Sequence, residues 1–151
     1  MVRQLDQPLP AAPDDKGSRA LCPSDAEALA VLMFSAYRGT VDDAGEGPSE
    51  ARAEVDRLLG GGYGGVDFAA SEVIERDGRV VCATPVTVYE GLPLVAFSMT
   101  DRDWKRRGLA RGGLLRAMHR LRAGGATKVQ LAVTAGNTPA ENLYAALGFV
   151  G

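Results

Sequence analysis

The sequence predicts an α/β fold in which helices cover both faces of a mixed β-sheet. Three observations support this class. Apolar residues recur at helical spacing before residue 60, extended segments separated by turn signals fill the middle of the chain, and the last third alternates between helix and strand. The chain has 151 residues, of which 46% are hydrophobic, so it is long enough to bury the core of one domain.

Composition and charge exclude several classes of protein. Charged residues make up 24% of the chain and the net charge is −2, which argues against a disordered chain and against a nucleic-acid-binding protein. Cys22 and Cys82 fit no metal-ligand or redox spacing. No apolar stretch approaches the roughly 20 residues of a membrane span, and the N-terminus lacks the apolar core of a signal peptide. We therefore expect a cytoplasmic location, with no metal site and no membrane contact.

The N-terminal segment differs in composition from the rest. Residues 1–17 are rich in Pro, Asp and Gln and predict a flexible tail, so that the folded domain is expected over residues 18–151. A short strand is predicted at 18–21. A helix follows, with Ser24 as its N-cap and Glu27 completing a capping box.

A second helix is predicted over 50–59, with Ser49 as its cap and a stop at Gly60. An acidic loop over residues 42–48 precedes it, and the glycine-rich segment 60–65 forms a connector to the strands that follow.

The middle of the chain predicts a meander of three strands, at 67–75, 79–89 and 94–100. The Asp-Gly pair at 77–78 indicates a hairpin turn between the first two. Pro85 marks an edge or a bulge within the second strand, because proline cannot donate to a ladder.

The last third predicts a helix at 108–122, a strand at 128–135 and a helix at 139–147. Thr138 and Glu141 form a second capping box at the start of the final helix. Tyr144 lies on the apolar stripe of that helix, where a tyrosine is usually a core residue.

Positive charge is concentrated in one segment. Residues 102–122 contain eight Lys or Arg and one acid, a net charge of +7, which leaves −9 on the rest of the chain. A basic segment in an acidic protein suggests a small anionic ligand, the alternative being a solvated basic helix face. The acidic remainder would repel a long polyanion, so nucleic acid is an unlikely partner on these grounds.

The basic segment begins with a loop suited to a pyrophosphate. Small residues at Gly108 and Ala110 allow close approach to the backbone, and the amides of the next helix are free donors at its positive end. Four basic side chains reinforce this charge, namely Lys105, Arg106, Arg107 and Arg111. Neither a P-loop nor a dinucleotide-binding GxGxxG pattern is present.

Two motifs together resemble the GNAT superfamily of acyl-CoA-dependent N-acetyltransferases. The segment 105–110 is similar to the family's Arg/Gln-x-x-Gly-x-Gly/Ala loop, with lysine at the Arg/Gln position. A second family block, Asn-x-x-Ala-x-x-Leu-Tyr-x-x-x-Gly-Phe, is filled at every position by Asn137, Ala140, Leu143, Tyr144, Gly148 and Phe149. The resemblance covers residues 18–151.

The resemblance implies a function and a site. It implies transfer of the acetyl group of acetyl-CoA to an amine acceptor, without a covalent acyl-enzyme and without a metal. Tyr144 is then the general acid, which protonates the departing thiolate. The cofactor-binding residues that it implies are Ser98, Met99, Thr100, Lys105, Arg106, Arg107, Gly108, Leu109, Ala110, Arg111 and Asn137.

Several alternatives stay open. Relatives continue beyond the position of Phe149 into two more strands, so the resemblance implies that the sheet lacks its last strands and has an open edge. We therefore expect self-association, as a homodimer, or a partner that supplies these strands. A non-catalytic CoA-binding or regulatory domain with the same fold is the alternative function.

The general base and the acceptor are not assigned by the motifs. Glu72, Glu75 and Glu90 are candidate bases by position alone. Asp42, Asp43 and Glu46 lie in the loop after the first helix, which in relatives borders the acceptor site. Three acids there would suit a cationic amine; the alternative is an acidic surface loop.

Overall fold

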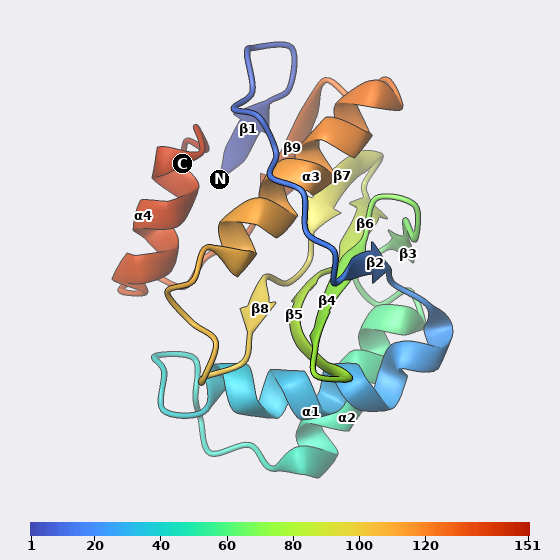
Figure 1. The fold of residues 1–151 in the computed structure, drawn as a ribbon, viewed down its shortest axis with the longest axis vertical. Coiled ribbons are helices and arrows are strands. Elements are labelled where there is room, and N and C mark those ends of the chain that lie inside the picture. Colours follow the sequence, from blue (N-terminus) through green and yellow to red (C-terminus); the bar gives the residue numbers. More distant parts are fainter.

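A mixed β-sheet forms the middle of the molecule, as the sequence predicts, and helices cover both of its faces (Figure 1). The structure, a computed structural model, describes all 151 residues. The sheet has two halves, with strand orders β1-β9-β7-β6-β3 and β2-β4-β5-β8. The strands are β1 Val2–Gln4, β2 Ser18–Ala20, β3 Gly65–Val66, β4 Glu72–Arg76, β5 Arg79–Thr84, β6 Val86–Tyr89, β7 Leu92–Val95, β8 Met99–Thr100 and β9 Lys128–Leu131.

Four α-helices flank the sheet: α1 Ala26–Tyr37, α2 Pro48–Leu59, α3 Leu109–Ala123 and α4 Thr138–Ala146. Successive residues of a strand point to opposite faces. Val73 of β4 packs in the core cluster of α1 and α2, whereas Ile74 packs against Leu109 at the start of α3. The α1–α2 pair and α3 therefore cover opposite faces.

The helix caps differ in part from the prediction. Asp25, not Ser24, accepts the backbone N–H of Cys22 at 2.8 Å, and a short 3₁₀ turn, Pro23–Asp25, precedes α1. At α4 the side chain of Asn137, rather than Thr138, accepts the N–H of Ala140 at 3.4 Å. At α2 the N-cap is Gly47 rather than Ser49, and the helix begins at Pro48. The caps of α1 and α4 lie within one residue of their predicted positions and that of α2 within two, which is the usual precision for helix ends.

Two of the predicted strands are interrupted. Pro85 separates β5 from β6, as predicted. The predicted strand 94–100 is broken as well, because residues 96–98 pair with no strand and the N–H of Ala96 bonds to the carbonyl of Pro85 at 3.0 Å. The predicted strand 67–75 begins only at Glu72. The break at 96–98 divides the sheet into its two halves.

The sheet opens between β7 and β9. These two strands are parallel neighbours, but they pair only at Leu94–Gln130 and Val95–Leu131. Beyond these pairs the chain at 96–98 turns toward β5, and β9 ends at Leu131, four residues before its predicted end. The opening lies at the carboxyl ends of two parallel strands, a common place for ligands in α/β folds.

The N-terminal segment is not a flexible tail, contrary to the sequence prediction. Residues Val2–Gln4 form β1, which lies beside β9 and antiparallel to it (Figure 1). Leu5 is completely buried in the core. The rest of the segment lies along α3, where Arg116 donates to the carbonyl of Pro13 at 2.7 Å. The composition of this segment favours little local secondary structure, but pairing of β1 with the distant strand β9 orders it.

The edge beside β9, which was predicted to be open, is paired. The strand β1 lies against β9 on one side, and on its other side Val2 exchanges two backbone hydrogen bonds with Val150. The two ends of the chain therefore lie close together (Figure 1). The prediction of self-association rested on an open edge at this position, and this edge gives it no support.

A buried ion pair fixes α3 against the sheet. Glu72 of β4 is 1% exposed and accepts two hydrogen bonds from Arg116, at 2.9 and 2.7 Å, and one from Arg120 at 3.0 Å. The helix approaches closely because residue 113 is glycine, where a Cβ would lie 2.6 Å from the hydroxyl of Thr84. These contacts hold the middle of α3 against the sheet.

Candidate active site

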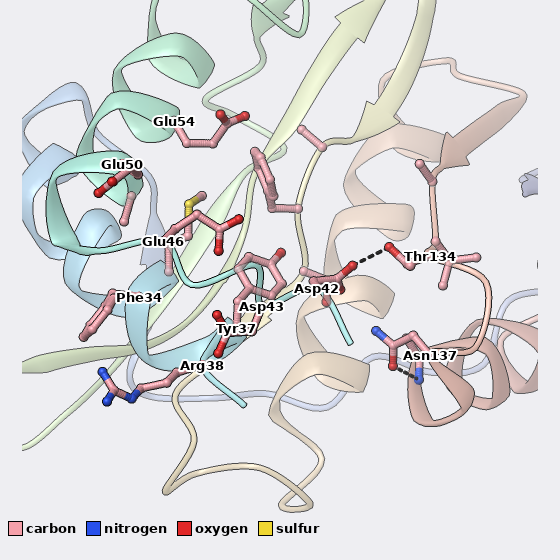
Figure 2. A pocket seen from close by; sticks show the side chains of 18 of the residues that line it. Phe34, Tyr37, Arg38, Asp42, Asp43, Glu46, Glu50, Glu54, Thr134 and Asn137 are labelled. Atoms are coloured by element: carbon pink, nitrogen blue, oxygen red, sulfur yellow. Dashed lines mark hydrogen bonds between the residues drawn. The ribbon is translucent and has the colours of Figure 1, made fainter. Parts of the chain in front are cut away.

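A cavity of about 660 Å³ lies where β7 and β9 diverge. One wall comes from α1, α2 and the loop between them, and the other from residues 131–134 and from α4 (Figure 2). Of its 23 lining residues, 12 are hydrophobic, and the polar ones are concentrated on the α1–α2 side. The cavity is large enough for a small organic substrate.

Tyr144 lines this cavity from α4. Its side chain is largely buried, with the residue 8% exposed, and its hydroxyl makes no hydrogen bond of normal geometry within the chain. Burial raises the pKa of the phenol, while the neighbouring Ser98 hydroxyl lowers it and Asp42 raises it. The phenol is therefore protonated at neutral pH and free to donate its proton to a ligand.

A second phenol, that of Tyr37, enters the same cavity from the last turn of α1. Burial raises its pKa, and the nearby Tyr144, Asp42 and Glu54 raise it further. Its hydroxyl also has no hydrogen-bond partner within the chain, so both phenols face the space that a ligand would fill. The sequence analysis did not single out Tyr37, because it reads as an ordinary apolar position at the end of a helix.

The predicted site residues are divided between two places. Ser98, Asn137 and Tyr144 line the cavity together. Met99 is completely buried beneath it in β8, and Thr100 lies against the thiol of Cys82 at 3.7 Å. The remaining predicted residues, 105–111, form the loop before α3 and its first turn, outside the cavity lining.

The loop before α3 has the backbone of an anion site. Arg106 and Gly108 both have positive φ, 65° and 77°, a local conformation that turns amides toward one point. Gly108 is the N-cap of α3 and no side chain caps the first amides of the helix. Arg106, Arg107 and Arg111 are exposed around it. A phosphate group would therefore meet free amides and positive charge there.

Lys105 is directed elsewhere. Its ammonium group donates to the carbonyl of Ala36 near the end of α1 at 2.8 Å, and burial lowers its pKa, with the charge of Arg102 adding to the effect. Its side chain therefore joins the loop to α1, and any contribution from this position to an anion site would come from its backbone.

This geometry leads to a specific expectation for two matched variants. Lys105→Met should change the Kd for CoA by less than about twofold, because its ammonium group is occupied by Ala36. Arg111→Met should raise that Kd by about fivefold, because this guanidinium at the start of α3 has no partner within the chain. Isothermal titration calorimetry with CoA measures both. A larger effect at Lys105 than at Arg111 would contradict this assignment.

The acidic residues fall into two groups. None of the three candidate bases lines the cavity: Glu72 is paired with Arg116 and Arg120, Glu75 pairs with Arg19 at 3.0 Å, and Glu90 lies in an exposed turn. The acidic loop does line it, through Asp42, Asp43 and Glu46. The helix α2 adds Glu50 and Glu54, which the sequence analysis missed. Their spacing of four residues places them on one helix face, the signal that could have found them.

Comparison with solved structures places this architecture among acetyltransferases. The chain is similar to a GCN5-related N-acetyltransferase from Sphaerobacter thermophilus, with a TM-score of 0.74 and 22% identity over 97% of this chain and 45% of that one, so it spans less than half of that relative. A GNAT family acetyltransferase from Brucella melitensis, solved in complex with acetyl-CoA, has a TM-score of 0.68 and 19% identity over 89% and 82% of the two chains. The PaiA N-acetyltransferase from Thermoplasma acidophilum, in complex with coenzyme A, has a TM-score of 0.67 and 13% identity over 88% of both.

The chain therefore has the fold of an acetyltransferase. The sequence profile of the acetyltransferase (GNAT) family matches residues 68–149, more than half of the chain. The protein belongs to the GNAT acetyltransferase family. No protein of curated function matches it in sequence.

No group of three or more His, Cys, Asp or Glu side chains is arranged to hold a metal ion. No helix combines the length and the apolar character needed to cross a membrane.

Proposed function

We propose that the protein transfers the acetyl group of acetyl-CoA directly to a primary amine of a small molecule or a protein. The observation that carries this proposal is the cavity between β7 and β9, with the buried and unpartnered phenol of Tyr144 in its wall. Membership of the GNAT family supports the cosubstrate, because members of this family are acyl-CoA-dependent acetyltransferases.

The residues fit the parts of acetyl-CoA by their chemistry. The free amides at the start of α3, together with Arg106, Arg107 and Arg111, would hold the pyrophosphate. The backbone groups of Phe97 and Ser98, which pair with no strand, offer hydrogen bonds to the amides of the pantetheine arm. Asn137 and Ser98 lie at the cavity wall on the two sides of the opening, where the acyl end would enter.

The chemistry needs few groups from the protein. Bound acetyl-CoA supplies a thioester whose carbonyl carbon accepts the amine and whose sulfur leaves as a thiolate. Tyr144 holds a proton on its Oη at neutral pH and donates it to that leaving sulfur, and the proton that the attacking amine nitrogen loses restores the phenol. A backbone N–H near Met99 would stabilise the negative charge that develops on the acyl oxygen. The cavity walls hold the amine close to the reacting carbon, so that a bimolecular step becomes effectively unimolecular.

Acetyl transfer itself tests the proposal. The protein is incubated with acetyl-CoA and a panel of primary amines that includes a lysine-containing peptide, and thiol release is followed together with the mass of the products. We expect thiol release that depends on the amine and an acetylated amine among the products. Binding of CoA without acetylation of any amine would contradict the proposal and favour a non-catalytic CoA-binding domain.

A further inference from the structure

The cavity carries an excess of negative charge on one side. Five carboxylates line it, with one guanidinium and no lysine. Asp42, Asp43 and Glu46 come from the α1–α2 loop, and Glu50 and Glu54 come from α2, so all five belong to one side of the cavity (Figure 2). Asp42 reaches across to the hydroxyl of Thr134 on the other side. This wall is hereafter the acidic wall, made of Asp42, Asp43, Glu46, Glu50 and Glu54.

The acidic wall is not neutralised by the protein. None of its carboxylates belongs to an ion pair, whereas Asp15, Asp25 and Glu72 elsewhere in the chain do. Arg38, the one cation in the cavity lining, lies over the ring of Phe34 at 5.3 Å instead. Glu54 is partly buried and makes no hydrogen bond or ion pair at all. Unpaired carboxylates that converge on a cavity attract a cation from solution.

Hydrogen bonds within the chain occupy only some of the carboxylate oxygens of the acidic wall. Asp43 accepts the backbone N–H groups of Gly39 and Gly45, at 2.7 and 2.8 Å, and therefore serves the fold of the loop. Glu46 and Glu50 each use a single oxygen on a backbone N–H, and Asp42 bonds to the hydroxyl of Thr134. The second oxygens of these carboxylates and both oxygens of Glu54 remain free.

A second feature, in the facing wall, shows that the cavity is built for a ligand. Tyr144 is 8% exposed and lines the cavity, yet its hydroxyl makes no hydrogen bond of normal geometry and has only the Ser98 hydroxyl beside it. Arg106, Arg107 and Arg111, the basic residues suited to phosphate groups, do not line the cavity. The acidic wall would repel the phosphates of CoA, so it belongs to the acceptor rather than to the cosubstrate.

We infer that the acceptor is an aliphatic amine that carries at least one further ammonium group, that is, a diamine or polyamine. This inference rests on the proposed function and specifies its substrate class. The hydrophobic half of the lining, which includes Phe97 and Val133, suits an aliphatic chain, and the acidic wall suits the second charge. Glu54 and Glu46, whose carboxylates extend toward the cavity from α2 and from the loop, are the specificity-determining residues (Figure 2).

A matched pair of ligands tests the second charge. Cadaverine and pentylamine have the same carbon chain and differ by one ammonium group. Their binding is measured by calorimetry, first to the protein alone and then in the presence of CoA, so that acetyl transfer is not required. We expect cadaverine to bind at least about tenfold more tightly, and this ratio to fall as the salt concentration rises.

Matched variants assign the effect to the acidic wall. The double variant Glu46→Gln, Glu54→Gln should reduce the cadaverine-to-pentylamine ratio to about threefold or less. Asp56→Asn on the same helix removes an exposed carboxylate that faces Arg52 outside the cavity, so it should leave the ratio unchanged. Circular dichroism of each variant confirms that it is folded.

The outcomes separate this inference from the acetyltransferase proposal. Equal binding of the two amines, an unchanged ratio in the double variant, or no binding of either amine with and without CoA would overturn the inference. Discrimination between the amines without any thiol release would support the acidic wall and overturn acetyl transfer. Thiol release with amines of any charge at equal efficiency would support acetyl transfer and overturn the inference.

Discussion

Tyr144→Phe should lower kcat for acetyl transfer by about a hundredfold or more while changing the Kd for acetyl-CoA by less than about twofold. The variant removes one oxygen atom and keeps the ring that packs edge-on against Phe149, with centroids 6.0 Å apart. Because the hydroxyl makes no hydrogen bond within the chain, its loss should also leave the free energy of unfolding nearly unchanged. Steady-state kinetics and calorimetry separate these effects.

Tyr89→Phe is the control for this experiment. Tyr89 lies at the end of β6, is 44% exposed and does not line the cavity. Its replacement should affect neither kcat nor acetyl-CoA binding. If Tyr144→Phe retained full kcat, Tyr144 would not be the general acid, and Tyr37, the second phenol of the cavity, would be the next residue to test.

Leu5→Ala should lower the free energy of unfolding by about 2–4 kcal/mol. Leu5 follows β1 and is completely buried in a core cluster with Val129 of β9 and Tyr144 of α4. Its backbone N–H bonds to the carbonyl of Thr127 at 2.7 Å. The N-terminal segment therefore packs in the same core as Tyr144, the candidate catalytic residue. Removal of the Leu5 side chain should for this reason also loosen the packing of α4.

Urea denaturation measures this effect, with Gln7→Ala as the matched control in the same segment. Gln7 is exposed, so its replacement should change the free energy of unfolding by less than about 0.5 kcal/mol. A loss of similar size at both positions, or no loss at Leu5, would mean that residues 1–5 do not pack against β9 in solution.

Some elements of the fold could be predicted because their signals are local. The turn at Asp77 and Gly78 depends on two residues with positive φ, 54° and 73°, and this pair of residues favours that conformation. Pro85 interrupts its strand because it lacks an N–H, whatever surrounds it. The residues of the second motif predicted α4, since its cap and apolar stripe lie within a dozen positions.

Other elements depend on distant partners and could not be predicted in this way. The strand β1 is only three residues long and is held by β9 and by Val150, more than a hundred positions away. The break at 96–98 lies inside the mostly apolar segment 94–100, so no local pattern reveals it. Pairing with two different strands, β6 on one side of the break and β5 on the other, determines where the run divides.

The candidate site shows the same division. Asn137 and Tyr144 were selected by a motif, Ser98 was implied by the family resemblance, and the three line one cavity. Glu54 was missed because acids on an amphipathic helix usually face solvent; only the packing of α2 beside the opening turns this one toward a cavity. Lys105 was included because the motif places a basic residue there, but its side chain bonds to α1.

Binding of acetyl-CoA is the measurement that bears most directly on this assignment. Acetyl-CoA is titrated into the protein by calorimetry, with dephospho-CoA and ATP as controls. We expect a Kd in the micromolar range for acetyl-CoA, weaker binding of dephospho-CoA, and little binding of ATP. The absence of acetyl-CoA binding in a sample shown to be folded by circular dichroism would contradict the assignment of the β7–β9 opening and the start of α3 as an acetyl-CoA site.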